Sequence, residues 1–166
     1  MTVREVRHLP DTVLRGKAKR VSIIDKSIHQ FIDDMIATMQ HTNGVGLAAP
    51  QIGVPLRIVV LKMPEEEPLV IINPEIVKRF GEREVVEGCL SAPGYQGLIK
   101  RSTSVTVKGL SREGAKIRIK ATDLMAQALE HELDHLNGVL YIDHIESEDK
   151  LYKINSETSD TERGAE

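Results

Sequence analysis

The sequence is poor in aromatic residues and contains a single cysteine. Of its 166 residues, two are Phe, three are Tyr and none is Trp, so we do not expect an aromatic platform for stacking nucleic-acid bases. One cysteine cannot form a disulfide within the chain, which suits a reducing cytosol. Lys and Arg number 22 against 25 Asp and Glu. This balance lacks the basic excess of a nucleic-acid-binding protein, and no nucleic-acid motif is present.

Long hydrophobic runs are also missing. No apolar stretch approaches the roughly 20 residues that a membrane-crossing helix needs. The first residues, MTVREVRHLPDTVLRGKAKR, carry charges throughout and have no apolar segment typical of a secretory signal. We therefore expect a cytoplasmic protein with no membrane partner.

The chain has the length of one ordinary domain and no internal repeat. We expect residues 1–154 to form a single catalytic domain. Residues 155–166 are polar and acidic, and we expect them to be a disordered tail.

Two segments have the periodicity of helices. Ser27–Gln40 places its apolar side chains at the i, i+3, i+4, i+7 spacing of an amphipathic helix, with Asp25 or Ser27 as its cap. A second helix is predicted from about Thr122 to Asn137, where Gly138 provides the stop.

Between these helices the pattern favours β-strands. The predicted strands, rich in Ile and Val or alternating apolar with polar residues, are Leu56–Lys62, Leu69–Asn73, Ser104–Lys108 and Ala115–Lys120. The segment Gly109–Gly114 is predicted to be a hairpin loop. Together these elements predict an α+β domain.

The segment HELDH, residues 131–135, carries the strongest chemical signal. On a helix His131 and His135 lie one turn apart on the same face, so both imidazoles can bind one metal ion. Glu132 can then reach water at that ion. Leu124 and Ala128 fall on the same stripe, which we interpret as the core-facing side of the helix. The alternative, a hydrogen-bonded surface pair of histidines, is disfavoured because such a buried pair is costly without a partner.

A catalytic metal site normally needs a third protein ligand. The acids and the histidine after Gly138 do not have the spacing of a zincin-type peptidase. Cys89, in the segment EGCLS, is the better candidate, because Gly88 permits a close approach of the backbone. The remaining histidines are interpreted as surface or capping residues: His8, His29, His41 and His144.

A third segment, GVGLAAPQ at residues 44–51, is dense in small residues. Taken alone it is a weak signal, and a tight turn between a helix and a strand is the favoured interpretation. However, GVGLAAPQ, EGCLS and HELDH in this order resemble the three signature motifs of the peptide deformylases. The resemblance implies a single α+β domain in which antiparallel β-sheets pack around a central metal-binding helix, with an N-terminal amphipathic helix.

The resemblance also implies roles for individual residues. Cys89, His131 and His135 would hold the metal, and Glu132 would be the general base. Gln51 and the backbone N–H of Leu90 would stabilise the oxyanion. The residues implied in substrate binding are Gly46, which would contact the peptide main chain, and Val45, Val85, Leu124 and Ala128, which would line a methionine pocket.

The implied reaction removes the N-formyl group from the initiator methionine of new polypeptides and releases formate. The partners would be N-formylmethionyl peptides, with a transient ribosome contact. The ligand types accept one divalent ion, and the resemblance favours Fe²⁺, with Zn²⁺, Ni²⁺ or Co²⁺ as other occupants.

Two residues depart from the pattern of the resembling family. Glu130 stands where Gln is common and could add negative charge near the site, and Gln96 stands where many members have a substrate-holding Arg. We also expect Arg101 to pair with Asp134, and Glu87 either to orient a ligand or to be a solvated carboxylate. Two other functions stay open: a general metallopeptidase in which Cys89 is only a buried residue, and a non-catalytic metal-stabilised binding module.

Overall fold

The computed structural model describes residues 1–154 and has two sheets and two α-helices. The tail that we expected to be disordered, residues 155–166, lies outside the described residues. The helices are α1, Lys26–His41, and α2, Asp123–Leu136. Among the helices of the described part, none is long and apolar enough to cross a membrane. The observed class is α+β, as the sequence predicts.

Five strands form the larger sheet, in the order β1-β2-β3-β6-β7, and every neighbouring pair is antiparallel. Its strands are β1 (Gly46–Ala48), β2 (Ile58–Leu61), β3 (Leu69–Phe80), β6 (Ser104–Leu110) and β7 (Lys116–Thr122). The smaller sheet is also antiparallel, in the order β4-β5-β8, with β4 (Arg83–Cys89), β5 (Ala92–Arg101) and β8 (Leu151–Lys153). Four short 3-10 helices connect these elements: Thr12–Arg15, Ala49–Ile52, Tyr141–His144 and Glu148–Lys150.

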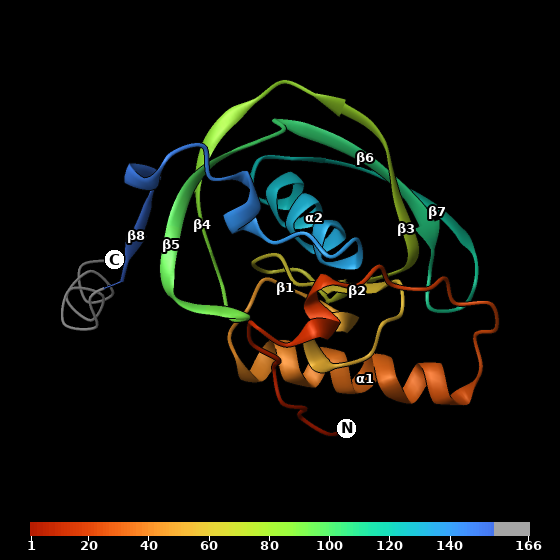
Figure 1. Ribbon diagram of the computed structural model, residues 1–166. Helices are drawn as coiled ribbons and strands as arrows, with labels where there is room; N and C mark the ends of the chain where they lie inside the picture. The colour runs from red at the N-terminus through yellow and green to blue at the C-terminus, as the bar shows by residue number, and fades with distance from the viewer. Residues whose placement is uncertain (155–166) are drawn as a thin grey trace.

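Helix α2 lies in the middle of the molecule, and the strands curve around it (Figure 1). One face of the larger sheet packs against α2 through residues such as Val105, Val107 and Leu129. The opposite face packs against α1, where Phe31, Ile32, Met35 and Met39 meet Ile58, Val60 and Ile72. The apolar stripe predicted for the first helix is therefore the side that covers the sheet.

The start of α1 agrees with one of the two caps expected from the sequence. The side chain of Asp25 accepts a hydrogen bond from the backbone N–H of Ile28, at 3.1 Å. This contact satisfies one of the free N–H groups at the start of the helix.

The sequence pattern missed the hairpin of β4 and β5, and it ended β3 at Asn73 although the strand continues to Phe80. These segments mix charged residues and glycine with isolated apolar ones, so their alternation is weak. These strands form because β4 pairs with β5 and the second half of β3 pairs with β6.

Candidate metal centre

The site forms where α2 meets the end of β4. Cys89 is the last residue of β4, and His131 and His135 project from α2. Nε2 of His135 lies 3.3 Å from Sγ of Cys89 and 3.3 Å from Nε2 of His131. One ligand atom from each of the three residues lies within 4.8 Å of the other two. The structure thus brings together the three residues that the sequence singled out.

These distances fit a metal ion. Ligand bonds of about 2.0–2.3 Å at tetrahedral angles separate two donor atoms by about 3.3–3.6 Å. The two printed separations of 3.3 Å lie at that value. Thiolate and imidazole donors are those that Zn²⁺ and other late divalent ions accept. A divalent ion therefore fits this donor set in both distance and chemistry.

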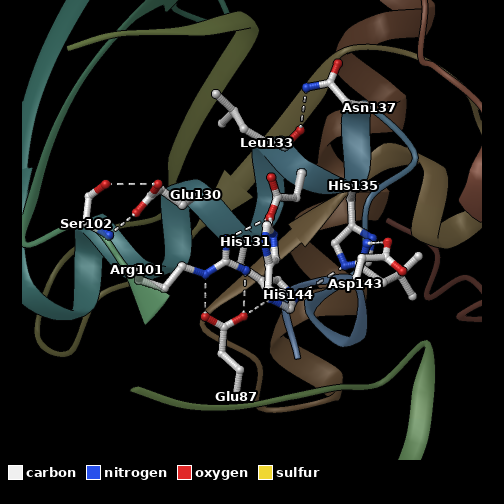
Figure 2. A network of polar contacts seen from close by, with 12 residues as sticks. Glu87, Arg101, Ser102, Glu130, His131, Leu133, His135, Asn137, Asp143 and His144 are labelled. Carbon is white, nitrogen blue, oxygen red and sulfur yellow. Dashed lines mark hydrogen bonds and ion pairs between the residues drawn. The ribbon is translucent and has the colours of Figure 1, made fainter. Parts of the chain in front are cut away.

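A carboxylate fixes the orientation of His131. Nδ1 of His131 lies 2.6 Å from Oε1 of Glu87 (Figure 2). A carboxylate accepts hydrogen bonds, so Nδ1 carries the proton and the lone pair of Nε2 faces Cys89 and His135. The structure therefore decides between the two interpretations of Glu87: it is buried and orients His131, a candidate ligand.

Glu87 is itself held by Arg101, as Figure 2 shows. Nε and Nη2 of Arg101 donate to the two oxygens of Glu87 at 2.7 and 2.9 Å. Nη1 donates to Oδ2 of Asp134 at 2.7 Å, which confirms the pairing expected from the sequence. Burial of the Glu87 carboxyl opposes its ionisation, but the hydrogen bonds and charges of Arg101 and His131 outweigh burial and lower the pKa of Glu87 to about 2.

The carboxylate of Glu132, on α2, lies in a different environment from that of Glu87 on β4. Burial raises the pKa of Glu132 to about 7, although the neighbouring His131 acts in the opposite direction. Its Oε1 is buried and has no hydrogen-bond partner within residues 1–154. Such a carboxyl can exchange a proton near neutral pH, which is the property that a general base requires.

The backbone at Gly46 comes close to Glu132. A β-carbon at this position would lie 2.5 Å from Oε2 and 3.0 Å from Cγ of Glu132. Only glycine permits this approach. The segment GVGLAAPQ therefore does more than form a turn, because it forms one wall of the site.

Gln51 completes this wall. Its Oε1 accepts a hydrogen bond from the backbone N–H of Ala48 at 2.9 Å. This bond directs Nε2 toward the centre, 3.5 Å from Sγ of Cys89 and 3.4 Å from Oγ of Ser91. The amide is thus held with its donor side facing Cys89 and Ser91.

A pocket opens beside these residues. Its lining comes from the start of β1 with the residue just before it and the 3-10 helix that follows it, from the end of β4 and from α2, and it includes Val45, Gly46, Gln51, Leu90, Leu124, Ala128, His131 and Glu132. Leu124 is 44% exposed, so the stripe that we interpreted as core-facing turns outward there and lines the pocket mouth.

Val85 does not line this pocket. It is buried against Ile99 and Tyr141, and Val86, the next residue, lines the pocket in its place. Successive side chains of a strand point to opposite faces, so a one-residue difference exchanges core for pocket. The sequence analysis also missed Gln127, which lines the pocket and donates to the carbonyl of Val86 at 3.3 Å. A single glutamine on a helix has no sequence signal that distinguishes a pocket residue from an ordinary surface residue.

Glu130 does not add an unpaired charge to the site. Its Oε1 accepts from the backbone N–H of Ser102 at 2.6 Å, and its Oε2 accepts from Ser102 Oγ and Arg79 Nε, each at 3.2 Å. Figure 2 shows the pair of Glu130 and Ser102 on the other side of α2 from His135. The Glu130 carboxylate therefore links α2 to Ser102, the residue that follows β5.

Comparisons with known proteins agree with this geometry. Residues 3–151 match the family described as polypeptide deformylase. A peptide deformylase of Dehalococcoides mccartyi (strain CBDB1) is 57% identical over 155 residues, which cover 93% of each chain. The crystal structure of a peptide deformylase from Legionella pneumophila matches with a TM-score of 0.85 at 46% identity, covering 87% of this chain and 86% of that one. The crystal structure of a peptide deformylase from Synechococcus elongatus in complex with actinonin matches with a TM-score of 0.84 at 42% identity, covering 87% of this chain and 80% of that one.

Proposed function

The chain belongs to the polypeptide deformylase family, and we propose that residues 1–154 are its catalytic domain, with Cys89, His131 and His135 as the metal ligands on a central metal-binding helix. The protein is a metal-dependent hydrolase that removes the N-formyl group from newly made polypeptides. The observation that carries the assignment of ligands is the 3.3 Å separation of their donor atoms.

Glu132 is the general base in this proposal. When bound, the divalent ion supplies Lewis-acid polarisation and lowers the pKa of water from 15.7 to about 7. Glu132 takes a proton from the attacking water and later delivers it to the leaving amine of the methionine. Its buried Oε1, which has no partner among the described residues, supports this role.

Gln51 and Leu90 stabilise the developing oxyanion. The Gln51 amide is already fixed by Ala48, so it does not have to reorganise during the reaction. Leu90 follows Cys89 directly, which keeps its backbone N–H beside the ligands. One such preorganised donor is worth about 3 kcal/mol in the transition state.

The pocket beside the ligands takes the methionine side chain. Its apolar residues Val45, Leu124 and Ala128 suit an unbranched thioether chain. Gly46 hydrogen-bonds the peptide main chain. Gln96, half-buried on β5, stands where many relatives have an arginine, so we propose weaker contacts to the peptide beyond the methionine.

Fe²⁺ is the proposed working ion, with Zn²⁺, Ni²⁺ or Co²⁺ as other occupants that the same donors accept. Metal analysis of protein purified without oxygen tests this point, and zinc alone in fully active protein would contradict it. A cytoplasmic location and a transient contact with the ribosome complete the proposal, because the substrate is the start of a new chain.

Release of formate from formyl-Met-Ala-Ser tests the function. Anaerobically purified protein is expected to release one formate per peptide. Cleavage of the unformylated peptide without formate release would instead favour a general metallopeptidase.

A further inference from the structure

The larger sheet has one face that is only partly covered. Helix α2 packs on one side of the sheet. On the other side α1 covers β1, β2 and the beginning of β3. Further along, the outer side of β3, β6 and β7 is directed away from α2 (Figure 1). This region is therefore available to a partner.

Basic side chains gather on this surface. Lys116, Arg118 and Lys120 are exposed and alternate along β7, so they point to the same side. Lys108 on β6 lies opposite Arg118, and Lys78 on β3 lies opposite Thr106. Together with Arg20, which lines a hollow with Lys108 and Lys116, these residues form the basic face: Arg20, Lys78, Lys108, Lys116, Arg118 and Lys120.

Little negative charge balances the basic face. Glu75 forms an ion pair with Lys108 at 3.6 Å. For the other five cations, residues 1–154 provide no carboxylate within salt-bridge distance. This surface is therefore basic although the chain as a whole has a formal net charge of -3.

Protection of the sheet edge does not account for the whole arrangement. Lysines on an edge strand such as β7 prevent pairing with other chains. However, Lys108 and Lys78 lie on β6 and β3, inside that edge. Like charges opposite each other, as in Lys108 and Arg118, also destabilise a sheet. A polyanionic partner would relieve this repulsion.

An aromatic ring lies among the cations. Phe80 is 70% exposed. It lines a surface hollow together with Lys78, Arg118, Lys120 and the hydroxyl residues Ser104 and Thr106. Cations and hydroxyls contact phosphates, and an exposed ring stacks on bases. This combination favours a nucleic acid over an acidic polypeptide.

We infer that the basic face binds RNA, with its cations on the phosphates and Phe80 stacked on an unpaired base. Strand β7, which carries three of the cations, ends at Thr122, and α2 begins at Asp123. Leu124, at the mouth of the pocket, follows. The strand that carries half of the basic face is therefore followed directly in the chain by the helix that lines the pocket.

The test is fluorescence anisotropy of a labelled RNA hairpin with a single-stranded loop, titrated with full-length protein at several salt concentrations. The variant Lys78→Gln/Arg118→Gln/Lys120→Gln removes three cations of the basic face. The control Lys17→Gln/Lys100→Gln/Lys153→Gln removes three exposed lysines elsewhere. Formate release from formyl-Met-Ala-Ser is measured for all three proteins.

We expect the basic-face variant to bind RNA about tenfold or more weakly, with a slope of log K against log salt reduced by about 3. The control should bind like the original protein, and all three should deformylate the free peptide equally. Equal RNA binding by both variants would overturn the inference, as would displacement of the RNA by polyglutamate at equal charge. Loss of formate release by all three proteins would instead contradict the proposed function.

Discussion

The backbone of Gly46 lies against the carboxylate of Glu132. A β-carbon on Gly46 would lie 2.5 Å from Oε2 of Glu132, so this glycine determines where the proposed base sits. The nearest atoms to a β-carbon on Gly44 would be 3.5 Å away, at an ordinary contact distance. The two glycines of the segment GVGLAAPQ therefore differ in how much room they leave for a side chain.

Gly46→Ala should displace the Glu132 carboxylate and lower kcat/KM for formyl-Met-Ala-Ser by about 10–100-fold, because a shift of about 1 Å in a catalytic group can have that effect. Steady-state formate release measures it. Gly44→Ala is the matched control and should remain near the original activity. Equal activity of the two variants would show that the close approach is not needed.

Cys89→Ser should weaken metal binding more than the roughly 10–100-fold typical of changes behind the ligands, since the thiolate is a direct ligand in this account. Chelator competition measures the affinity. His8→Asn, a change of an exposed histidine, is the control. If Cys89→Ser bound metal normally, the cysteine would be only a buried residue, as in the general metallopeptidase alternative.

Arg101→Ala should lower both metal occupancy and stability. It leaves the buried Glu87 without its partner, and breaking a buried ion pair costs about 3–5 kcal/mol. His131 would also lose its fixed orientation. Metal content and urea denaturation give the two readouts. Arg79→Ala, which breaks the more exposed ion pair with Glu130, should leave metal content unchanged. Unchanged metal content in Arg101→Ala would refute the positioning role.

The lowered pKa of Glu87 predicts that the free energy of unfolding depends on pH in the acidic range. Its pKa is about 2 in the folded chain against an ordinary value of 4.5. A carboxyl with a lowered pKa stabilises the fold above its unfolded pKa, and this stabilisation is lost as pH falls from about 4.5 through about 2. In urea denaturation with a chelator present, Glu87→Gln should be less stable at neutral pH and lose less on acidification. Parallel pH profiles would contradict this assignment.

The sequence predicted some of this site well because its signals are local. The spacing of His131 and His135 is a property of one helix. Cys89 and Glu87 reach those histidines only through the hairpin of β4 and β5, whose register shifts between Glu87 and Cys89. Which of Val85 and Val86 faces the pocket depends on that pairing, and periodicity in one strand does not determine it.

The sequence analysis did not predict the basic face for a similar reason. Lys78 and Lys120 are far apart in the sequence. They line the same hollow only because β3 and β7, the strands that carry them, both pair with β6. A balanced total charge predicts nothing about such a local gathering. Charge totals describe the chain, whereas partners respond to the charges that the fold places on one face.

The most direct test of the central claim compares Glu132→Gln with the original protein, with metal content measured on the same samples. The account predicts that the variant keeps its metal and loses about 10²–10⁴-fold in the rate of formate release, because the general base is removed while the ligands stay in place. A variant that retains both its metal and its full rate would contradict the assignment of Glu132 as the base.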